Sequence, residues 1–371
     1  MIHSISTKKQ SRSRFLLFLF LVSLILLILG LLFSLKWGPA SISWAELYQA
    51  LTYQHSDKVH LYIQTLRLPR TLTACMVGTL LALAGLLIQL TTRNPLASPH
   101  VFGINAGASL AVVLGLVLSA QLSATSTMLM AFAGAAAGAW LVWSLAGFAD
   151  KQPVRLALAG ITIHFMLSSL TEGFIILNQY STESMIFWLA GSVSQAGWTE
   201  VRMIFPFFIV SLALLVMLLP ALRLLLLEDE IAAGLGQRVP LVRALALLLV
   251  IVMAGSAVAV CGPIGFVCLI VPHIARALVG TRLSLLVPMT ALGGGLLLVY
   301  ADLLSRIISF PFESPVGIVT SAIGGPFFIY LARKKGGGHD DQNFPSCGRL
   351  AFAAPARHRF GQCGSTSYSL A

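Results

Sequence analysis

Apolar residues in this chain are gathered into long runs that short polar segments separate. Ten runs reach or approach the length of about 20 residues that a helix needs to cross a bilayer. They lie at 15–36, 71–91, 101–120, 126–147, 156–178, 202–226, 244–262, 264–281, 284–304 and 315–332. The runs lack the alternation typical of a barrel strand, and a backbone in lipid must satisfy its own hydrogen bonds. The pattern therefore predicts an all-α fold, a polytopic transmembrane bundle of about ten helices.

Composition supports a membrane protein over a soluble one. Of the 371 residues, 57% are hydrophobic and 10% are charged, whereas soluble domains carry about 25% charged residues. Lys and Arg number 24 against 13 Asp and Glu, an excess that in a soluble protein would suggest nucleic acid. Here the basic residues are few and lie between apolar runs, so we expect contact with membrane lipid and none with nucleic acid.

The positions of the basic residues predict the topology, because loops on the cytoplasmic side are enriched in Lys and Arg. Most of them fall on the same side as the basic N-terminus if each run crosses once. These residues are Arg93, Lys151, Arg155, Arg223, Arg238, Arg243, Arg276, Arg282, Arg333, Lys334 and Lys335. We expect both termini in the cytoplasm and the polar, aromatic segment 41–66 along the outer surface.

The chain divides into three parts by composition. Residues 1–14 form a basic, cytoplasmic N-terminus, and residues 15–335 hold all the apolar runs. Residues 336–371 are rich in Ser, Pro, Gly and His and lack helical periodicity, so we expect a disordered tail without an assigned function. The five cysteines form no CxxC pair and no metal spacing, which predicts neither a disulfide framework nor a metal site.

One apolar run carries a polar stripe. In 156–178, His164, Ser168, Thr171 and Glu172 recur at the spacing of one helix face. Ionisable groups are costly against lipid, so this face should turn toward protein or a water-filled path. The stripe is a candidate lining of a translocation path. The alternatives are a hydrogen-bond network between helices and a proton relay. The stripe is also the only support for a proton-coupled secondary transporter.

Three blocks of sequence, in this order, resemble a known family. They are Arg67-Leu-Pro-Arg70 with Asn94-Pro-Leu-Ala-Ser-Pro99 and Gly103-Ile-Asn-Ala-Gly107, then Glu228 to Gly236, then Gly262 to Arg276 with Ala301-Asp302 and Arg306. The chain is similar to the FecCD-type permeases, the membrane subunits of ABC importers for iron–siderophore complexes and vitamin B12. Within that family the first block looks closer to ferric-citrate and ferric-siderophore members.

The resemblance implies a multi-pass subunit of the bacterial inner membrane that imports a ferric chelate. Such a subunit pairs with a second copy or a paralogue, and both pairings stay open. Two ATPase subunits bind beneath the pair, and a periplasmic or lipid-anchored substrate-binding protein docks above it. A vitamin B12 or haem permease of the same family is the alternative, and the residues do not name the chelate.

Catalysis is expected on another chain. The sequence holds no G-x-x-x-x-G-K-[ST] phosphate loop, and no nucleophile–base set or metal cluster is placed for chemistry. We therefore expect a transport subunit that is not an enzyme and needs no cofactor of its own. ATP and Mg²⁺ would be bound by the partner ATPase.

The resemblance also implies roles for two sets of residues. Arg67, Arg70 and Arg306 match arginines that meet acidic residues of the binding protein; the alternative is that they are interfacial anchors without a partner. The inner-loop segment matches the helix that rests in a groove of the ATPase and passes on its motion. Its residues are Glu228, Asp229, Ala232, Ala233, Gly234, Leu235 and Gly236.

Overall fold

The computed structural model describes residues 2–38, 42–52, 58–119, 122–146, 153–178, 182–227, 229–308 and 312–336, and these ranges contain helices and no strand. In chain order the helices are α1 (Ile2–Lys36), α2 (Trp44–Leu51), α3 (Lys58–Tyr62), α4 (Leu68–Thr91), α5 (Ile104–Leu118), α6 (Ala124–Ala146), α7 (Pro153–Leu177), α8 (Thr182–Leu189), α9 (Trp198–Leu225), α10 (Asp229–Gly234), α11 (Val239–Cys261), α12 (Val267–Val279), α13 (Leu283–Ile308) and α14 (Val316–Gly336). A π-helical turn (Ile63–Arg67) joins α3 to α4, and a 3₁₀ turn (Pro99–Phe102) precedes α5. The predicted all-α fold is confirmed.

Each of the ten predicted apolar runs is a helix. Seven helical stretches are long and apolar enough to cross a membrane, within α1, α3–α4, α6, α7, α9, α11 and α13. Three apolar helices are shorter, namely α5, α12 and the segment Val316–Tyr330 of α14. At 1.5 Å per residue, the 13 residues of α12 extend only about 20 Å. Such a helix therefore needs non-helical backbone beside it to complete a crossing. A membrane protein tolerates non-helical backbone at this depth only where protein or a water-filled cavity surrounds that backbone.

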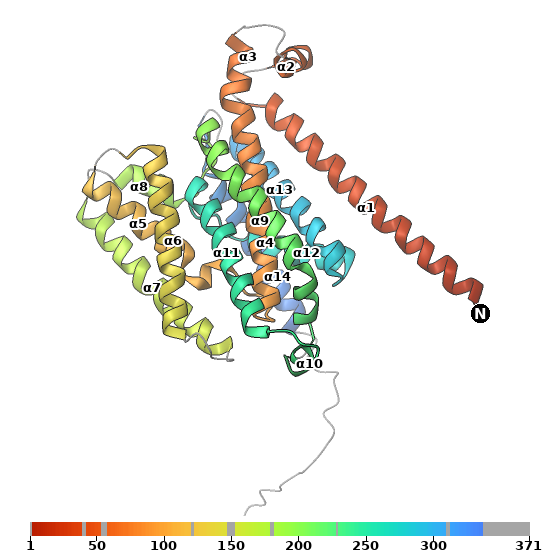
Figure 1. Ribbon diagram of the computed structural model, residues 1–371. Helices are drawn as coiled ribbons and strands as arrows, with labels where there is room; N and C mark the ends of the chain where they lie inside the picture. The colour runs from red at the N-terminus through yellow and green to blue at the C-terminus, as the bar shows by residue number, and fades with distance from the viewer. Residues whose placement is uncertain are drawn as a thin grey trace, which may run out of the picture. The chain divides into compact units, whose positions relative to one another are not determined.

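Helix α4 is the centre of the bundle. In its most apolar window 89% of the residues are buried, against 11% in α1 and 22% in α7. Figure 1 shows α4 running among α9, α11, α12 and α13, and all four pack against it. The outer helices α1 and α7 keep apolar surface that lipid or another subunit can cover.

Glycines let the helices around α4 approach closely. A Cβ added at Gly85 would come within 2.0 Å of the carbonyl oxygen of Cys268 on α12. Gly78 of α4 and Gly294 of α13 face each other, since a Cβ on either would lie 2.3 Å from the other's carbonyl oxygen. Close contact of backbones through small residues is the usual packing of membrane helices.

The segment before α4 is more helical than its composition predicts. Helix α2 begins with a capping box in which the Ser43 backbone N–H donates to the Glu46 carboxylate at 2.7 Å. This bond holds the pKa of Glu46 below its ordinary value. The helix that was expected to begin at 71 is continuous from Lys58. Pro69, in the first turn of α4, has no backbone N–H that could donate to the carbonyl oxygen four residues earlier. The π-helical turn lies directly before α4, beside this missing hydrogen bond.

Contacts along the chain define two compact units, Met1–Ile329 and Tyr330–Ala371. The first holds the helices from α1 to most of α14, and the second holds the last turns of α14. Helix α1 begins at Ile2, so the basic N-terminal residues continue the first helix. The expected domain boundaries at 14 and 335 stay predictions, and residues 337–371 of the expected tail lie outside the described residues.

Replacing Gly85 with Val should lower the stability of the bundle, because the side chain would collide with the backbone of α12. We expect little folded protein after detergent extraction, and a clearly lower Tm for what remains. Gly173→Ala on α7 is the control, since a Cβ there has no atom within 4 Å. Normal stability of the Gly85→Val protein would contradict the close packing described here.

Candidate functional site

A buried carboxylate joins two helices at the end of the bundle where α4 begins. Asp302 of α13 is 1% exposed. Its Oδ1 accepts hydrogen bonds from Nε and Nη2 of Arg70 at 3.0 and 2.8 Å, and its Oδ2 accepts from Arg306 Nη2. Two guanidinium groups thus share one carboxylate, and the pairing offsets the cost of burying all three charges.

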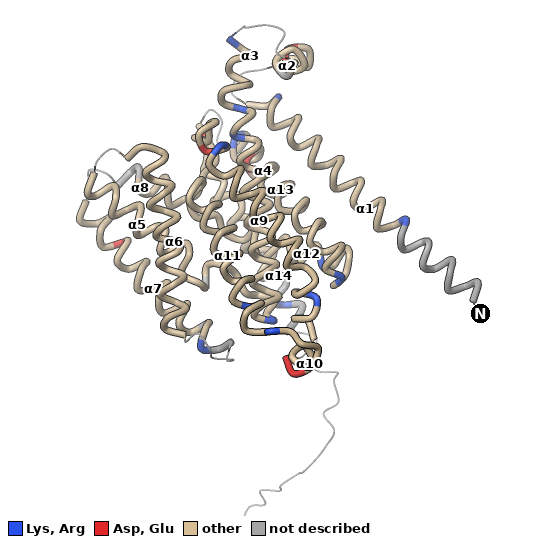
Figure 2. The backbone as a smooth tube through the Cα atoms, viewed as in Figure 1, with Lys and Arg blue, Asp and Glu red and all other residues tan. Residues whose placement is uncertain are grey.

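The same cluster reaches α1 and the segment after α13. Arg306 Nη1 donates to the carbonyl oxygen of Ser34 on α1 at 2.9 Å. Arg70 Nη1 donates to Oε2 of Glu313 at 2.6 Å, and the Glu313 side chain is 32% exposed. Figure 2 shows acidic and basic residues gathered mostly toward the helix ends, with long uncharged stretches between them.

Arg67 stabilises the end of the first helix. Its Nη1 donates to the carbonyl oxygens of Leu35 and Lys36 at 2.8 and 2.7 Å. These carbonyls belong to the last turn of α1, where no intrahelical donor remains and the helix dipole favours a cation. The guanidinium carbon also lies 5.0 Å from the ring centroid of Tyr62.

A second ionic cluster holds α10 at the end of the bundle where α4 ends. Asp229 Oδ1 accepts from Nη2 of Arg93 at 2.8 Å and from Nη2 of Arg243 at 3.0 Å. Arg93 Nη2 also donates to the carbonyl oxygens of Leu225 and Leu227. Arg93 lies just after α4 and has a left-handed backbone with φ of 51°. The short helix is thereby connected to α4, α9 and α11.

The short helix α10 exposes aliphatic side chains next to the acidic residue Glu230. Ala232 is buried, while Ile231 and Leu235 are 52% and 62% exposed. Side chains added at Gly234 or Gly236 would meet open space, and Gly236 ends the turn with φ of 84°. The helix therefore presents exposed aliphatic groups on a surface free of bulky neighbours, a form suited to a protein groove.

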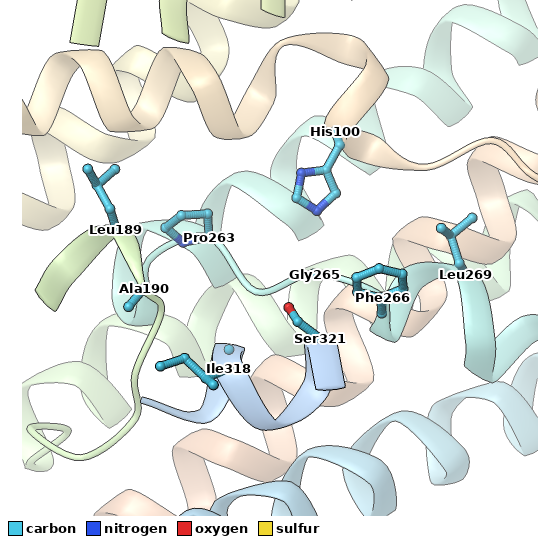
Figure 3. Close-up of a pocket in the computed structure, with 10 residues that line it drawn as sticks. His100, Leu189, Ala190, Pro263, Gly265, Phe266, Leu269, Ile318 and Ser321 are labelled. Atoms are coloured by element: carbon cyan, nitrogen blue, oxygen red, sulfur yellow. The ribbon is translucent and has the colours of Figure 1, made fainter. Parts of the chain in front are cut away.

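A cavity of about 600 Å³ lies where α8, α12 and α14 meet the 3₁₀ turn. Most of its lining is apolar, and its polar side chains are His100 and Ser321, which Figure 3 shows on opposite sides of the space. The Asn105 amide nitrogen lies 2.9 Å from Nδ1 and 3.3 Å from Nε2 of His100, so this side chain holds the imidazole ring beside the cavity.

The loop before α12 shapes this cavity. Phe266 has a left-handed backbone with φ of 65°, which is unusual for an aromatic residue. Its ring packs so closely on Gly324 of α14 that a Cβ there would lie 2.2 Å away. Pro263, in the same loop, also lines the cavity. The loop thus supplies the non-helical backbone that the short α12 requires.

Comparison with known proteins identifies the family. The model of the FecCD transport family matches residues 26–334. The chain belongs to this family. It is a FecCD-family membrane permease, as the sequence blocks predict.

Two relatives and one solved structure show how far the likeness extends. The Fe(3+)-citrate import system permease protein YfmD of Bacillus subtilis (strain 168) is 47% identical over 89% of this FecCD permease and 98% of its own length. The Fe(3+) dicitrate transport system permease protein FecD of Escherichia coli (strain K12) is 42% identical over 81% of this chain and 93% of its own length. A structure described as a metal-chelate type ABC transporter in an inward-facing conformation superposes with a TM-score of 0.76 at 30% identity, over 85% of this chain and 99% of that one.

The structure brings the three predicted outer arginines of this FecCD permease together. Arg67, Arg70 and Arg306 are 3%, 7% and 6% exposed, and each donates to acceptors of this chain. They are therefore not exposed interfacial anchors. Contact of these arginines with a binding protein stays a prediction. Such a contact would have to form beside, or in place of, the hydrogen bonds that the arginines already make within this chain.

The other predicted residues are placed as follows. The inner-loop residues from Asp229 to Gly236 form α10 and the turn after it, while Glu228 lies outside the described residues. In the stripe on α7, Thr171 is buried and donates to the carbonyl oxygen of Leu167, whereas Glu172 is exposed. Within the part of α7 that the structure describes, no hydrogen bond joins the four stripe residues, and their role as path lining stays a prediction.

Sequence reasoning missed three residues that the structure makes prominent. His100 and Ser321 are the polar pair of the cavity, and Glu313 binds Arg70 across 243 positions. His100 offered a signal, because it is an isolated ionisable residue beside an apolar run. Ser321 and Glu313 offered none, since their partners are distant in the sequence.

Asp302→Asn should strongly destabilise the cluster that Asp302 forms with Arg70 and Arg306. The change leaves two buried guanidinium groups with one carboxylate that is only partly buried, and removing one partner of a buried ion pair costs roughly 3–5 kcal/mol. We expect a Tm several degrees lower in detergent. Glu313→Gln is the matched comparison, since its side chain is partly exposed and retains a hydrogen-bond acceptor. Equal Tm values for the two variants would contradict the difference in burial.

Proposed function

We propose that this chain is the membrane-spanning subunit of an importer that carries a ferric chelate, a siderophore complex or ferric citrate, into the cytoplasm. The observation that carries the proposal is the 47% identity along nearly the whole length of a permease named for Fe(3+)-citrate import. Membership of the FecCD family favours import driven by ATP over proton-coupled transport. Vitamin B12 and haem remain the alternative cargoes within the family.

The partners follow from this function. A second permease, either another copy or a paralogue, would complete the path across the membrane. Two ATPase subunits would bind ATP and Mg²⁺, so this chain would need no cofactor. A substrate-binding protein would deliver the chelate to the outer end, where the cluster around Arg70 lies. The basic residues at the inner ends favour a cytoplasmic location for both termini.

Each described cluster has a part in the proposed cycle. Helix α10 would bind a groove of the ATPase through Ile231 and Leu235. Asp229 would then transmit a displacement of α10 to Arg93 and α4. The cavity between His100 and Ser321 would receive part of the chelate in transit. An N–H donor and a hydroxyl suit the oxygen atoms of citrate or a siderophore, and the apolar remainder of the lining keeps the binding weak enough for release.

Leu235→Asp should abolish transport while leaving the bundle intact. Leu235 lies on an exposed turn outside the apolar helices, but a carboxylate buried without a partner in the ATPase groove is strongly unfavourable. We expect loss of iron uptake and of the rise in ATP hydrolysis that the loaded binding protein causes. Leu235→Met, which keeps the apolar contact, should behave as wild type. Normal uptake by a well-expressed Leu235→Asp protein would rule out this seat for the ATPase.

Ser321→Phe should slow uptake at a different step. The ring would fill much of the space between Ser321 and His100, so the chelate would pass poorly, while docking and basal ATP hydrolysis should be unchanged. Uptake of radioactive iron supplied as ferric citrate or a siderophore complex measures the effect, with Ser321→Ala as the control of similar size. If both variants transport at the wild-type rate, the cavity lies off the path.

A further inference from the structure

We propose that Glu313 is a displaceable partner of Arg70: it occupies the guanidinium group until an acidic side chain of the substrate-binding protein takes its place. The inference rests on the proposed function, because it concerns the same outer surface. Arg70 binds two acidic residues, Asp302 and Glu313. They differ in burial, in the hydrogen bonds that they accept and in the backbone that carries them.

Asp302 is the permanent partner. It is 1% exposed, and both of its oxygens are used, Oδ1 by Arg70 and Oδ2 by Arg306. It lies within α13, so its backbone cannot move without the helix. Leaving two arginines buried without it would be very costly. No outside group can replace it at acceptable cost.

Glu313 is bound quite differently. It holds a single nitrogen of Arg70, Nη1, through Oε2, and its side chain is 32% exposed against 8% for that of Arg70. It lies on the irregular segment 312–315 between α13 and α14. Water already solvates part of the carboxylate, so releasing it from Arg70 has a small net cost.

Access to the cluster runs through the place that Glu313 holds. Arg67 and Arg306 are nearly fully buried and bind carbonyl oxygens of α1. Of the two carboxylates that bind Arg70, only that of Glu313 is partly exposed. Three arginines and two carboxylates leave the cluster one positive charge in excess, which attracts an incoming acid. That acid can grip Arg70 only where Glu313 now lies.

The exchange would also affect the start of α14. Glu313 lies three residues before Val316, the first residue of this helix, and Ile318 and Ser321 of the helix line the cavity. Once Glu313 leaves Arg70, one attachment of the segment before α14 is lost. Docking on the outer surface would therefore loosen the first turn of a helix that borders the proposed path.

The test measures docking of the cognate substrate-binding protein, purified without chelate, on the permease–ATPase complex in nanodiscs. Glu313→Gln removes the charge that competes for Arg70, so we expect the Kd for docking to fall about three- to tenfold, in the range of a partly exposed ion pair. Glu200→Gln is the matched control: the carboxylate of this residue caps α9 by accepting from the backbone N–H of Gly197, and among the described residues it forms no ion pair with an arginine.

Hydrogen exchange gives an independent readout. In wild type, amides of 312–318 should exchange faster once the binding protein docks, whereas in Glu313→Gln they should exchange fast beforehand. An unchanged or higher Kd for Glu313→Gln, with no docking-dependent exchange in wild type, would show that Glu313 is a fixed part of the cluster. Failure of the binding protein to dock on wild type would instead overturn the proposed function.

Discussion

Charges buried among apolar helices have to be neutralised by partners within the protein, and in this chain that requirement is met where α4 begins, by the ion pair of Arg70 with Asp302. Just after the other end of α4, Arg93 binds Asp229 in a second ion pair that is partly exposed. Both contacts join α4 to segments more than 130 positions away. Because α4 is also the most buried of the long apolar helices, a displacement at either end has a rigid, close-packed element along which to travel.

The second constraint is length. Helices as short as α5 and α12 cannot cross a bilayer alone, so the chain completes their paths with turns and loops. Those turns and loops include Phe266, which has an unusual left-handed backbone with φ of 65°, and Gly103, whose φ of 68° a glycine adopts without strain. They are also where the cavity forms. The same shortage of helical length that strains the backbone thus creates the space that a solute can enter.

Much of the fold was predictable because its signals are local. Apolar runs predict where ten of the helices lie, and the family resemblance predicts the short helix α10. The helical extension from Lys58 was hidden, because a helix that leaves the hydrocarbon no longer needs apolar residues. Family motifs marked Arg67, Arg70 and Arg306, yet only the structure shows their burial. The pairing of Arg70 with Glu313 depends on how α4 and the end of α13 meet, which no local pattern contains.

The contact between Gly78 and Gly294 has a consequence for how the sequence can change. Every single-base substitution that alters a glycine codon without stopping translation introduces a side chain, and here any side chain meets a carbonyl oxygen at 2.3 Å. Neither glycine can be replaced while the other remains, and replacing both only adds a second collision. Over evolutionary time this crossing of α4 and α13 should therefore be among the slowest-changing points of the chain, however freely the lipid-facing residues around it are exchanged.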